Sequence, residues 1–85
     1  MEYDEIISEC KKKCRYGDLW QEFSVDELVF YSYIKGKRGR ILYRRGMTDF
    51  AKDDIMDSIN IGIMAIQKIE EDINNVSNYS TLPKQ

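Results

Sequence analysis

The sequence predicts an all-α fold, in which a three-helix unit pairs its two long helices as a hairpin. Apolar residues recur at helical spacing in three segments, the only proline lies near the C-terminal end, and start and stop signals flank the segments. We expect helices over about residues 2–14, 25–45 and 49–74. These would form a single helical domain, 1–74, followed by a polar and frayed C-terminal tail, 75–85.

The first predicted helix has acidic residues at its start and lysines at its end, which suits the helix dipole. Cys10 and Cys14 lie one helical turn apart. The sequence contains no histidine and no other cysteine, so a zinc site cannot be completed. We therefore interpret the two cysteines as half-buried thiols on one side of the helix. That side consists of Tyr3, Ile6, Ile7, Cys10 and Cys14.

The second predicted helix begins with a capping box, because Ser24 is followed by Glu27 three residues later. Gly46 is placed to end it. On a helical wheel its apolar residues fall within an arc of about 160°, which we expect to be packed. The arc contains Leu28, Phe30, Tyr31, Ile34, Ile41 and Leu42.

In the third predicted helix, five isoleucines and one glycine recur at alternating spacings of four and three residues. This is the pattern of a packed helical seam. Its opposite side includes Ile61 and Met64, so the helix is apolar on two sides and needs two partners. One would be the second helix, and the other a second subunit that associates through helix 49–74 in an oligomeric bundle. The isoleucine seam consists of Ile55, Ile59, Gly62, Ile66, Ile69 and Ile73.

The composition sets limits on function. The chain has 85 residues with 13 basic and 15 acidic side chains, a net charge of −2. So short a chain buries a marginal core, for which oligomerisation is a common remedy. It is not a polycation, so nucleic acid is not the expected partner. No signal peptide or membrane-length apolar run is seen, so we predict a cytoplasmic protein without a membrane partner.

The segment 33–46 holds six basic residues and no acid. The helical wheel divides these cations into two groups. Lys35, Arg38 and Arg45 fall inside the apolar arc and would point towards packed surface. The remaining three form a solvated face: Lys37, Arg40 and Arg44.

Cations that point towards packed surface need an anion, because an unpaired buried charge is costly. One alternative is an ion pair with Asp53, Asp54 or Asp57 of the third helix. The other is a phosphate or nucleotide, which suits the planar fork of arginine. Both can hold, since a carboxylate could orient Arg38 while phosphate takes its remaining donors.

Two further features lie near these cations. Gly36 and Gly39 lack side chains, which allows close approach of either another helix or a ligand. Tyr16 and Trp20, in "YGDLW", could stack on a nucleotide base, although Trp20 could instead cap the small core.

The segments "YDEIISEC", "YGDLW", "IKGKR" and "DSINIGIMAI" follow one another in the order seen in a family of small phage and bacterial proteins. Over about residues 3–70 the chain resembles this family, the nucleotide-modification-associated domain of the first type. The resemblance implies a nucleotide site that includes Asn60. The positions that look like the family motifs are Tyr3, Tyr16-Gly17-Asp18 with Trp20, Lys35 with Arg38, and Asp57 with Asn60.

That family is distantly similar to all-α NTP pyrophosphatases of the MazG type, which hold magnesium between two carboxylate motifs. Asp54 and Asp57 could stand for the second motif, but no equivalent of the first is found. A weaker similarity links "IKGKRG" and "INIGIMAIQKI" to phage hairpin proteins that sequester cyclic nucleotide immune signals. Those are small oligomers that bind without turnover.

Three hypotheses follow. The first is a nucleotide-binding small helical oligomer that acts without turnover or cofactor, a phage-type anti-defence protein in the host cytoplasm. Its phosphate-binding cations would be Lys35, Arg38 and Arg45, with Asp54 and Asp57 as orienting carboxylates. The second is a metal-dependent pyrophosphatase, with Mg²⁺ at these two carboxylates. The third is a helical protein-interaction module in which the cations pair only with acids.

Overall fold

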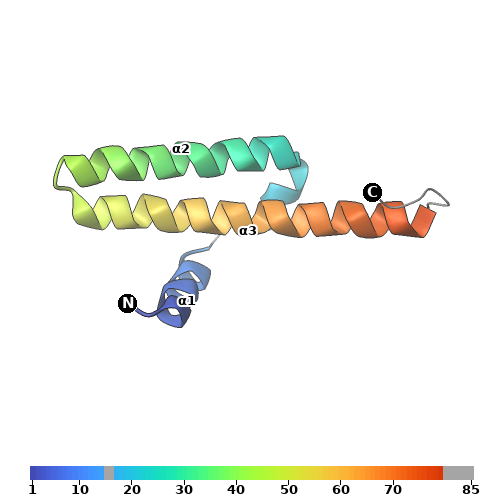
Figure 1. Cartoon of the computed structure of the whole chain (residues 1–85), viewed down its shortest axis with the longest axis horizontal. Coiled ribbons are helices and arrows are strands. Elements are labelled where there is room, and N and C mark those ends of the chain that lie inside the picture. Colours follow the sequence, from blue (N-terminus) through green and yellow to red (C-terminus); the bar gives the residue numbers. More distant parts are fainter. Residues whose placement is uncertain (15–16, 80–85) are drawn as a thin grey trace.

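The computed structural model describes residues 1–14 and 17–79, with side chains described as far as Asn74. Two long antiparallel helices form a hairpin, and a short N-terminal helix crosses the longer of them (Figure 1). The predicted all-α class and the predicted pairing of the long helices are confirmed. The elements are α1 (Tyr3–Lys13), the 3₁₀ helix η1 (Leu19–Glu22), α2 (Val25–Arg44) and α3 (Thr48–Tyr79).

The boundaries of α2 follow the predicted signals. The Glu27 backbone N–H donates to Ser24 Oγ at 3.1 Å, and the Ser24 N–H donates to Glu27 Oε1 at 2.9 Å. At the other end, Gly46 has a φ of 78°, a left-handed conformation that glycine adopts without strain. The chain then reverses and α3 starts at Thr48.

α3 is longer than predicted. It continues to Tyr79, so the proposed tail is helical over 75–79, and residues 80–85 lie outside the described part. No glycine or proline interrupts the sequence between Gly62 and Pro83, so nothing stops the helix near residue 74. No helix in the described residues has a stretch apolar enough to cross a membrane.

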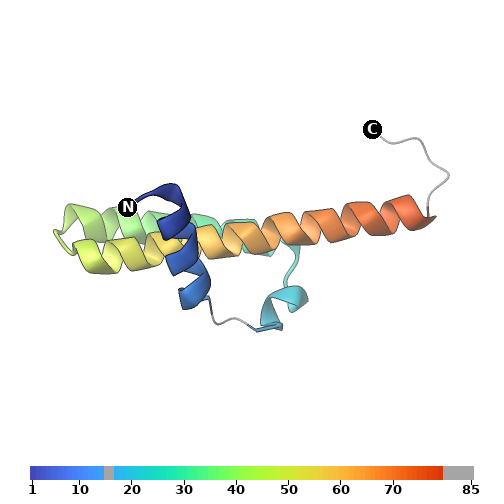
Figure 2. The same ribbon diagram turned by 90° about the horizontal axis from the view of Figure 1, so that it is seen from below.

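Because α3 has 32 residues and α2 has 20, α3 is longer by about 18 Å. The C-terminal part of α3 extends past the start of α2, and in both views no other helix lies beside it (Figures 1 and 2). We call residues 69–79 the overhang.

Small residues bring α2 and α3 close together. Ser32 and Ser58 exchange hydrogen bonds, since each Oγ donates to the other residue's carbonyl oxygen at 2.8 Å. Gly39 is buried, and a Cβ there would lie 2.8 Å from Ile55 Cγ1 and 3.2 Å from the Ala51 carbonyl oxygen. Gly39 therefore serves close helix packing, the first of the two alternatives for the glycines.

The core lies beside the first half of α2. Trp20 and Phe23, from η1 and the residue after it, pack against a buried cluster formed by the two long helices. Trp20 therefore caps the small core, as one of the two sequence interpretations predicted. The buried cluster consists of Leu28, Ile61, Met64 and Ala65.

α1 supplies the second partner that α3 requires. It crosses α3, as Figure 2 shows, and the Asn60 side-chain amide donates to the Cys10 carbonyl oxygen at 2.9 Å. Cys10 is fully buried, and this burial raises the pKa of its thiol. Cys14 is exposed, because α1 ends at Lys13. The prediction of two half-buried thiols was therefore wrong for both cysteines.

The predicted apolar arc of α2 is only partly covered. Leu28 is buried, but Phe30, Tyr31 and Ile41 are exposed. A single partner helix covers a strip narrower than the arc, and α1 packs on α3 instead of extending this cover. The wheel identified the side of α2 correctly for Leu28 but overestimated the width of the packed surface.

Candidate functional site

A group of basic and acidic side chains lies where the end of α1 and the C-terminal half of α2 meet the start of α3. We call it the charge cluster. Its cations come from α1 and α2, whereas its carboxylates all come from α3. It consists of Lys13, Lys35, Arg38, Asp53, Asp54 and Asp57.

Asp57 binds cations from both neighbouring helices. The Lys13 ammonium donates to Asp57 Oδ1 at 2.8 Å, and the Lys35 ammonium lies 3.5 Å from Asp57 Oδ2. The Asp57 side chain is only 13% exposed. Burial lowers the pKa of Lys13, but the hydrogen bonds to Asp57 and Asp53 outweigh it, so the pKa is raised overall. Asp57 thus joins all three helices.

Asp54 faces α2 alone. Its Oδ1 lies 3.9 Å from the Lys35 ammonium, and its Oδ2 lies 3.4 Å from Arg38 Nε. Oδ2 is buried and accepts no hydrogen bond, so the contact with Arg38 is an ion pair only. The Arg38 side chain is 60% exposed. The structure therefore contains the ion-pair alternative for Lys35 and Arg38, while most of Arg38 is open to solvent.

Lys13 is the member of the cluster that sequence reasoning missed. It was seen only as part of a basic helix end, because its partners lie at least 40 residues along the chain. The available signal was the spacing of Asp53 and Asp57, one turn apart, which places two carboxylates where a single lysine can reach both.

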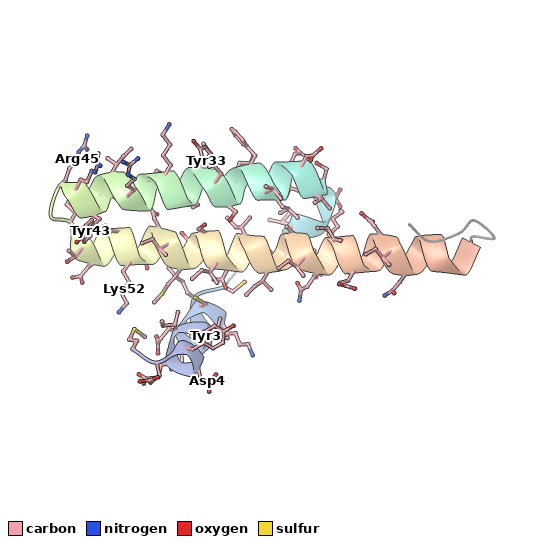
Figure 3. All side chains as sticks on the ribbon, viewed as in Figure 1. Tyr3, Asp4, Tyr33, Tyr43, Arg45 and Lys52 are labelled. Carbon is pink, nitrogen blue, oxygen red and sulfur yellow. The ribbon has the colours of Figure 1, made fainter. Side chains whose placement is uncertain are left out.

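The other candidate residues are placed differently. Arg45 is exposed at the C-cap of α2 (Figure 3), so its predicted orientation towards packed surface was wrong. The helix ends at Arg44, and a residue beyond the last turn no longer follows the wheel. Asn60 holds the α1 backbone and Trp20 caps the core. Tyr16 lies outside the described residues.

The arrangement of charges bears on the magnesium hypothesis. In the part of the chain that the structure describes, no three acidic or cysteine side chains are grouped so as to hold a metal ion. Asp54 and Asp57, the proposed ligands, instead face Lys35, which contacts both. Cations already neutralise the two carboxylates, so the present geometry offers no basis for a step that uses a metal.

A second feature is the extent of exposed apolar surface. Among the described residues, six apolar side chains are buried and sixteen large ones are exposed. Four exposed isoleucines belong to the isoleucine seam: Ile55, Ile66, Ile69 and Ile73. The seam is therefore only partly covered within this chain. Large exposed apolar side chains gathered on one element mark interaction sites in small proteins.

No family model matches the sequence, and neither a comparison with curated proteins nor one with solved structures finds a match. The resemblance to the nucleotide-modification-associated domain therefore stays a prediction.

Proposed function

We infer that this protein is a helical interaction module that docks through the last three residues of the isoleucine seam, Ile66, Ile69 and Ile73. The observation that supports it is the exposure of these three side chains. Ile66 is 61% exposed and Ile69 and Ile73 are also exposed, although their spacing is that of a packed helix interface. Exposed β-branched side chains at regular helical spacing gain free energy when another helix covers them.

The charge cluster supports this inference. Carboxylates of α3 already accompany Lys35 and Arg38, so these cations need no ligand to balance them. The cluster instead fixes α1 and α2 on α3, while Ile66, Ile69 and Ile73 stay exposed.

Replacing Ile66 with glutamate tests the proposal. We expect the wild-type protein, purified from the cells that make it, to appear by native mass spectrometry as an assembly. Ile66→Glu should lose that assembly, because a carboxylate buried in an apolar interface is costly. The circular dichroism of the variant should stay helical, since Ile66 is exposed within the chain.

Gln67→Glu is the matched control, because it adds the same charge one residue along, at an exposed position off the seam. It should assemble like the wild type. A wild-type protein found only as an isolated monomer, or an Ile66→Glu variant that assembles normally, would contradict the proposed function.

A specific observation favours anion binding as a second candidate function. The ion pair with Asp54 uses Nε of Arg38. The Arg38 side chain is 60% exposed, so the terminal amino groups of Arg38 could still bind phosphate. The sequence from Leu28 to Thr48 has no acid to oppose an anion. This is the nucleotide-binding hypothesis with the carboxylate as orienting group. The exposed Arg45 follows at the end of the same helix.

Isothermal titration against mononucleotides and cyclic di- and trinucleotides tests this candidate. We expect Arg38→Gln to weaken binding about tenfold or more, a loss typical of a charge-assisted hydrogen bond. Lys37→Gln, an exposed position one residue earlier, should leave the affinity nearly unchanged. The candidate fails if no nucleotide releases or absorbs heat at concentrations near 1 mM, which corresponds to about −4 kcal/mol.

A further inference from the structure

We propose that a second copy of this chain packs antiparallel on the side of α3 that α1, α2 and η1 leave open within the described residues. The two hairpins then form a four-helix bundle. The proposal goes beyond the proposed function, because it uses a different side of α3 and shares only Ile66 with the docking residues named above. It is supported by the coverage of α3, by a regular apolar stripe on the open side, and by opposite charges at the two ends of that stripe.

Three sides of α3 are occupied within the chain. α2 lies on the side of Gly62, and α1 lies on the opposite side, where it contacts Asp57 and Asn60 (Figure 1). η1 covers a third side, where the Lys68 ammonium donates to the Gln21 carbonyl oxygen at 2.7 Å. On a helical wheel the fourth side lies about a quarter turn from Gly62 and roughly opposite Lys68.

The fourth side carries a second regular stripe, which we call the flank stripe. Its residues recur at spacings of four, three, four, three and four, the pattern of a helix that packs against another helix. Its four central members are apolar. Two of them, Ile63 and Ile66, are 38% and 61% exposed, and the other two are half-buried. The flank stripe consists of Lys52, Met56, Ile59, Ile63, Ile66 and Glu70.

The flank stripe is complementary to itself in the antiparallel orientation. With a twofold axis between Ile59 and Ile63, each of these residues lies opposite the other residue in the second copy. Met56 of each copy then lies opposite Ile66 of the other. Every apolar member of the stripe meets an apolar member, so one surface complements itself, as a twofold interface requires.

The charges at the ends of the stripe favour this orientation. Lys52 and Glu70 are both exposed, and neither takes part in an ion pair within the described residues. Antiparallel packing brings Lys52 of each copy opposite Glu70 of the other, which gives two ion pairs. A parallel pair would place lysine beside lysine and glutamate beside glutamate, which is unfavourable.

α2 extends the same interface. Val29 and Tyr33 are 54% and 61% exposed. On a helical wheel they lie on the flank of α2 away from Tyr31, whose ring packs on Phe23 at a centroid distance of 5.5 Å. The hydrogen bonds between Ser32 and α3 place these two residues level with the centre of the flank stripe. The two copies of α2 therefore also lie side by side, as in a four-helix bundle.

Disulfide cross-linking tests the arrangement. Lys52→Cys and Glu70→Cys are made separately in a Cys14→Ser background that keeps the buried Cys10, and the two proteins are mixed and oxidised. We expect a 52–70 disulfide and little 52–52 or 70–70 product. Antiparallel packing separates the two copies of either position by about 27 Å along the axis, too far for a disulfide. Glu71→Cys is the matched control, because it is exposed one residue along but about 100° off the stripe, and it should link to position 52 much less.

Two glutamate variants separate this inference from the proposed function. Ile63 belongs only to the flank stripe, and Ile73 belongs only to the docking residues named above. We expect Ile63→Glu to abolish the 52–70 disulfide and the dimer measured by light scattering, because a carboxylate buried in an apolar interface is costly. Ile73→Glu should leave both nearly unchanged. Both residues are exposed, so both variants should stay helical by circular dichroism.

The opposite result, loss of the dimer with Ile73→Glu but not with Ile63→Glu, overturns the present inference and leaves the interaction module standing. Predominant 52–52 and 70–70 disulfides, or an assembly formed only with a different protein, do the same. A protein that is monomeric by light scattering, without cross-links and without another bound protein, overturns both proposals.

Charge reversal provides an independent measurement. Lys52→Glu should weaken dimerisation about tenfold at low salt, because it places like charges at both ends of the interface. Adding Glu70→Lys exchanges the two charges and should restore most of the affinity. A dimer whose affinity does not respond to Lys52→Glu overturns the antiparallel arrangement.

Discussion

Replacing Gly39 with alanine is expected to destabilise the protein, even though alanine is the better helix former. The added Cβ would lie 2.8 Å from Ile55 Cγ1 and 3.2 Å from the Ala51 carbonyl oxygen. The first atom is close to the α3 backbone and the second belongs to it, so neither can turn away. The two helices must separate, which costs about 1–3 kcal/mol and so exceeds the gain of about 1 kcal/mol in helix propensity over most of that range.

Gly36→Ala is the matched control, because it makes the same change one turn earlier in α2. A Cβ there would meet only Ser58 Oγ, at an ordinary contact distance of 3.5 Å. The gain in helix propensity should therefore remain, and the variant should be equal to or more stable than the wild type by up to about 1 kcal/mol. Equal effects of the two substitutions would show that Gly39 is not a contact point between the helices.

Urea unfolding followed by circular dichroism measures both variants. Protein concentrations must be equal, because the proposed assembly would make the apparent stability depend on concentration. We expect the free energies of unfolding of the two variants to differ by about 2 kcal/mol. That would be a large fraction of the total stability of a domain of this size.

Asp57→Ala is the second substitution with a large expected effect. It removes the carboxylate that accepts from Lys13 at 2.8 Å and contacts Lys35 at 3.5 Å. Both lysines are largely covered, so each is left with one weaker partner in a site of limited solvation. We expect a loss of about 1–2 kcal/mol, below the 3–5 kcal/mol of a fully buried pair because the lysines retain some solvent contact.

The structural effect of Asp57→Ala should be concentrated in α1. The contacts that hold this helix to α3 include the Lys13 ion pairs and the Asn60 hydrogen bond to Cys10. Hydrogen exchange should therefore accelerate in α1 more than in α2. Asp53→Ala removes a carboxylate that is 61% exposed, and should change stability by no more than about 0.5 kcal/mol. If Asp57→Ala and Asp53→Ala lose equal stability and show the same hydrogen exchange in α1, Asp57 is not the carboxylate that holds α1 on α3.

The raised pKa of Lys13 gives this prediction a pH dependence. A lysine whose pKa is higher in the folded than in the unfolded state stabilises the fold fully below the unfolded value of about 10.4. The contribution is lost as the pH rises through the folded pKa. The difference in stability between wild type and Asp57→Ala should therefore be constant near neutrality and shrink at strongly alkaline pH.

The sequence by itself determined the local structure. The capping box at Ser24, the positive-φ glycine at Gly46 and the periodicity of the isoleucines depend on neighbours within about four residues. Such short-range signals fixed the helix class, the hairpin and the boundaries of α2. They did not fix the end of α3, since no residue before Pro83 terminates a helix.

The tertiary structure alone decided which side chains meet. A helical wheel gives the direction of a side chain but not the position or width of the partner, so Arg45 and Phe30 were expected to face packed surface and are exposed. The wheel also cannot show that α1 occupies one side of α3, which brings Lys13 to Asp57, or that Ile66, Ile69 and Ile73 stay exposed. Long-range contacts of this kind depend on how helices dock, and docking depends on the complementarity of whole surfaces.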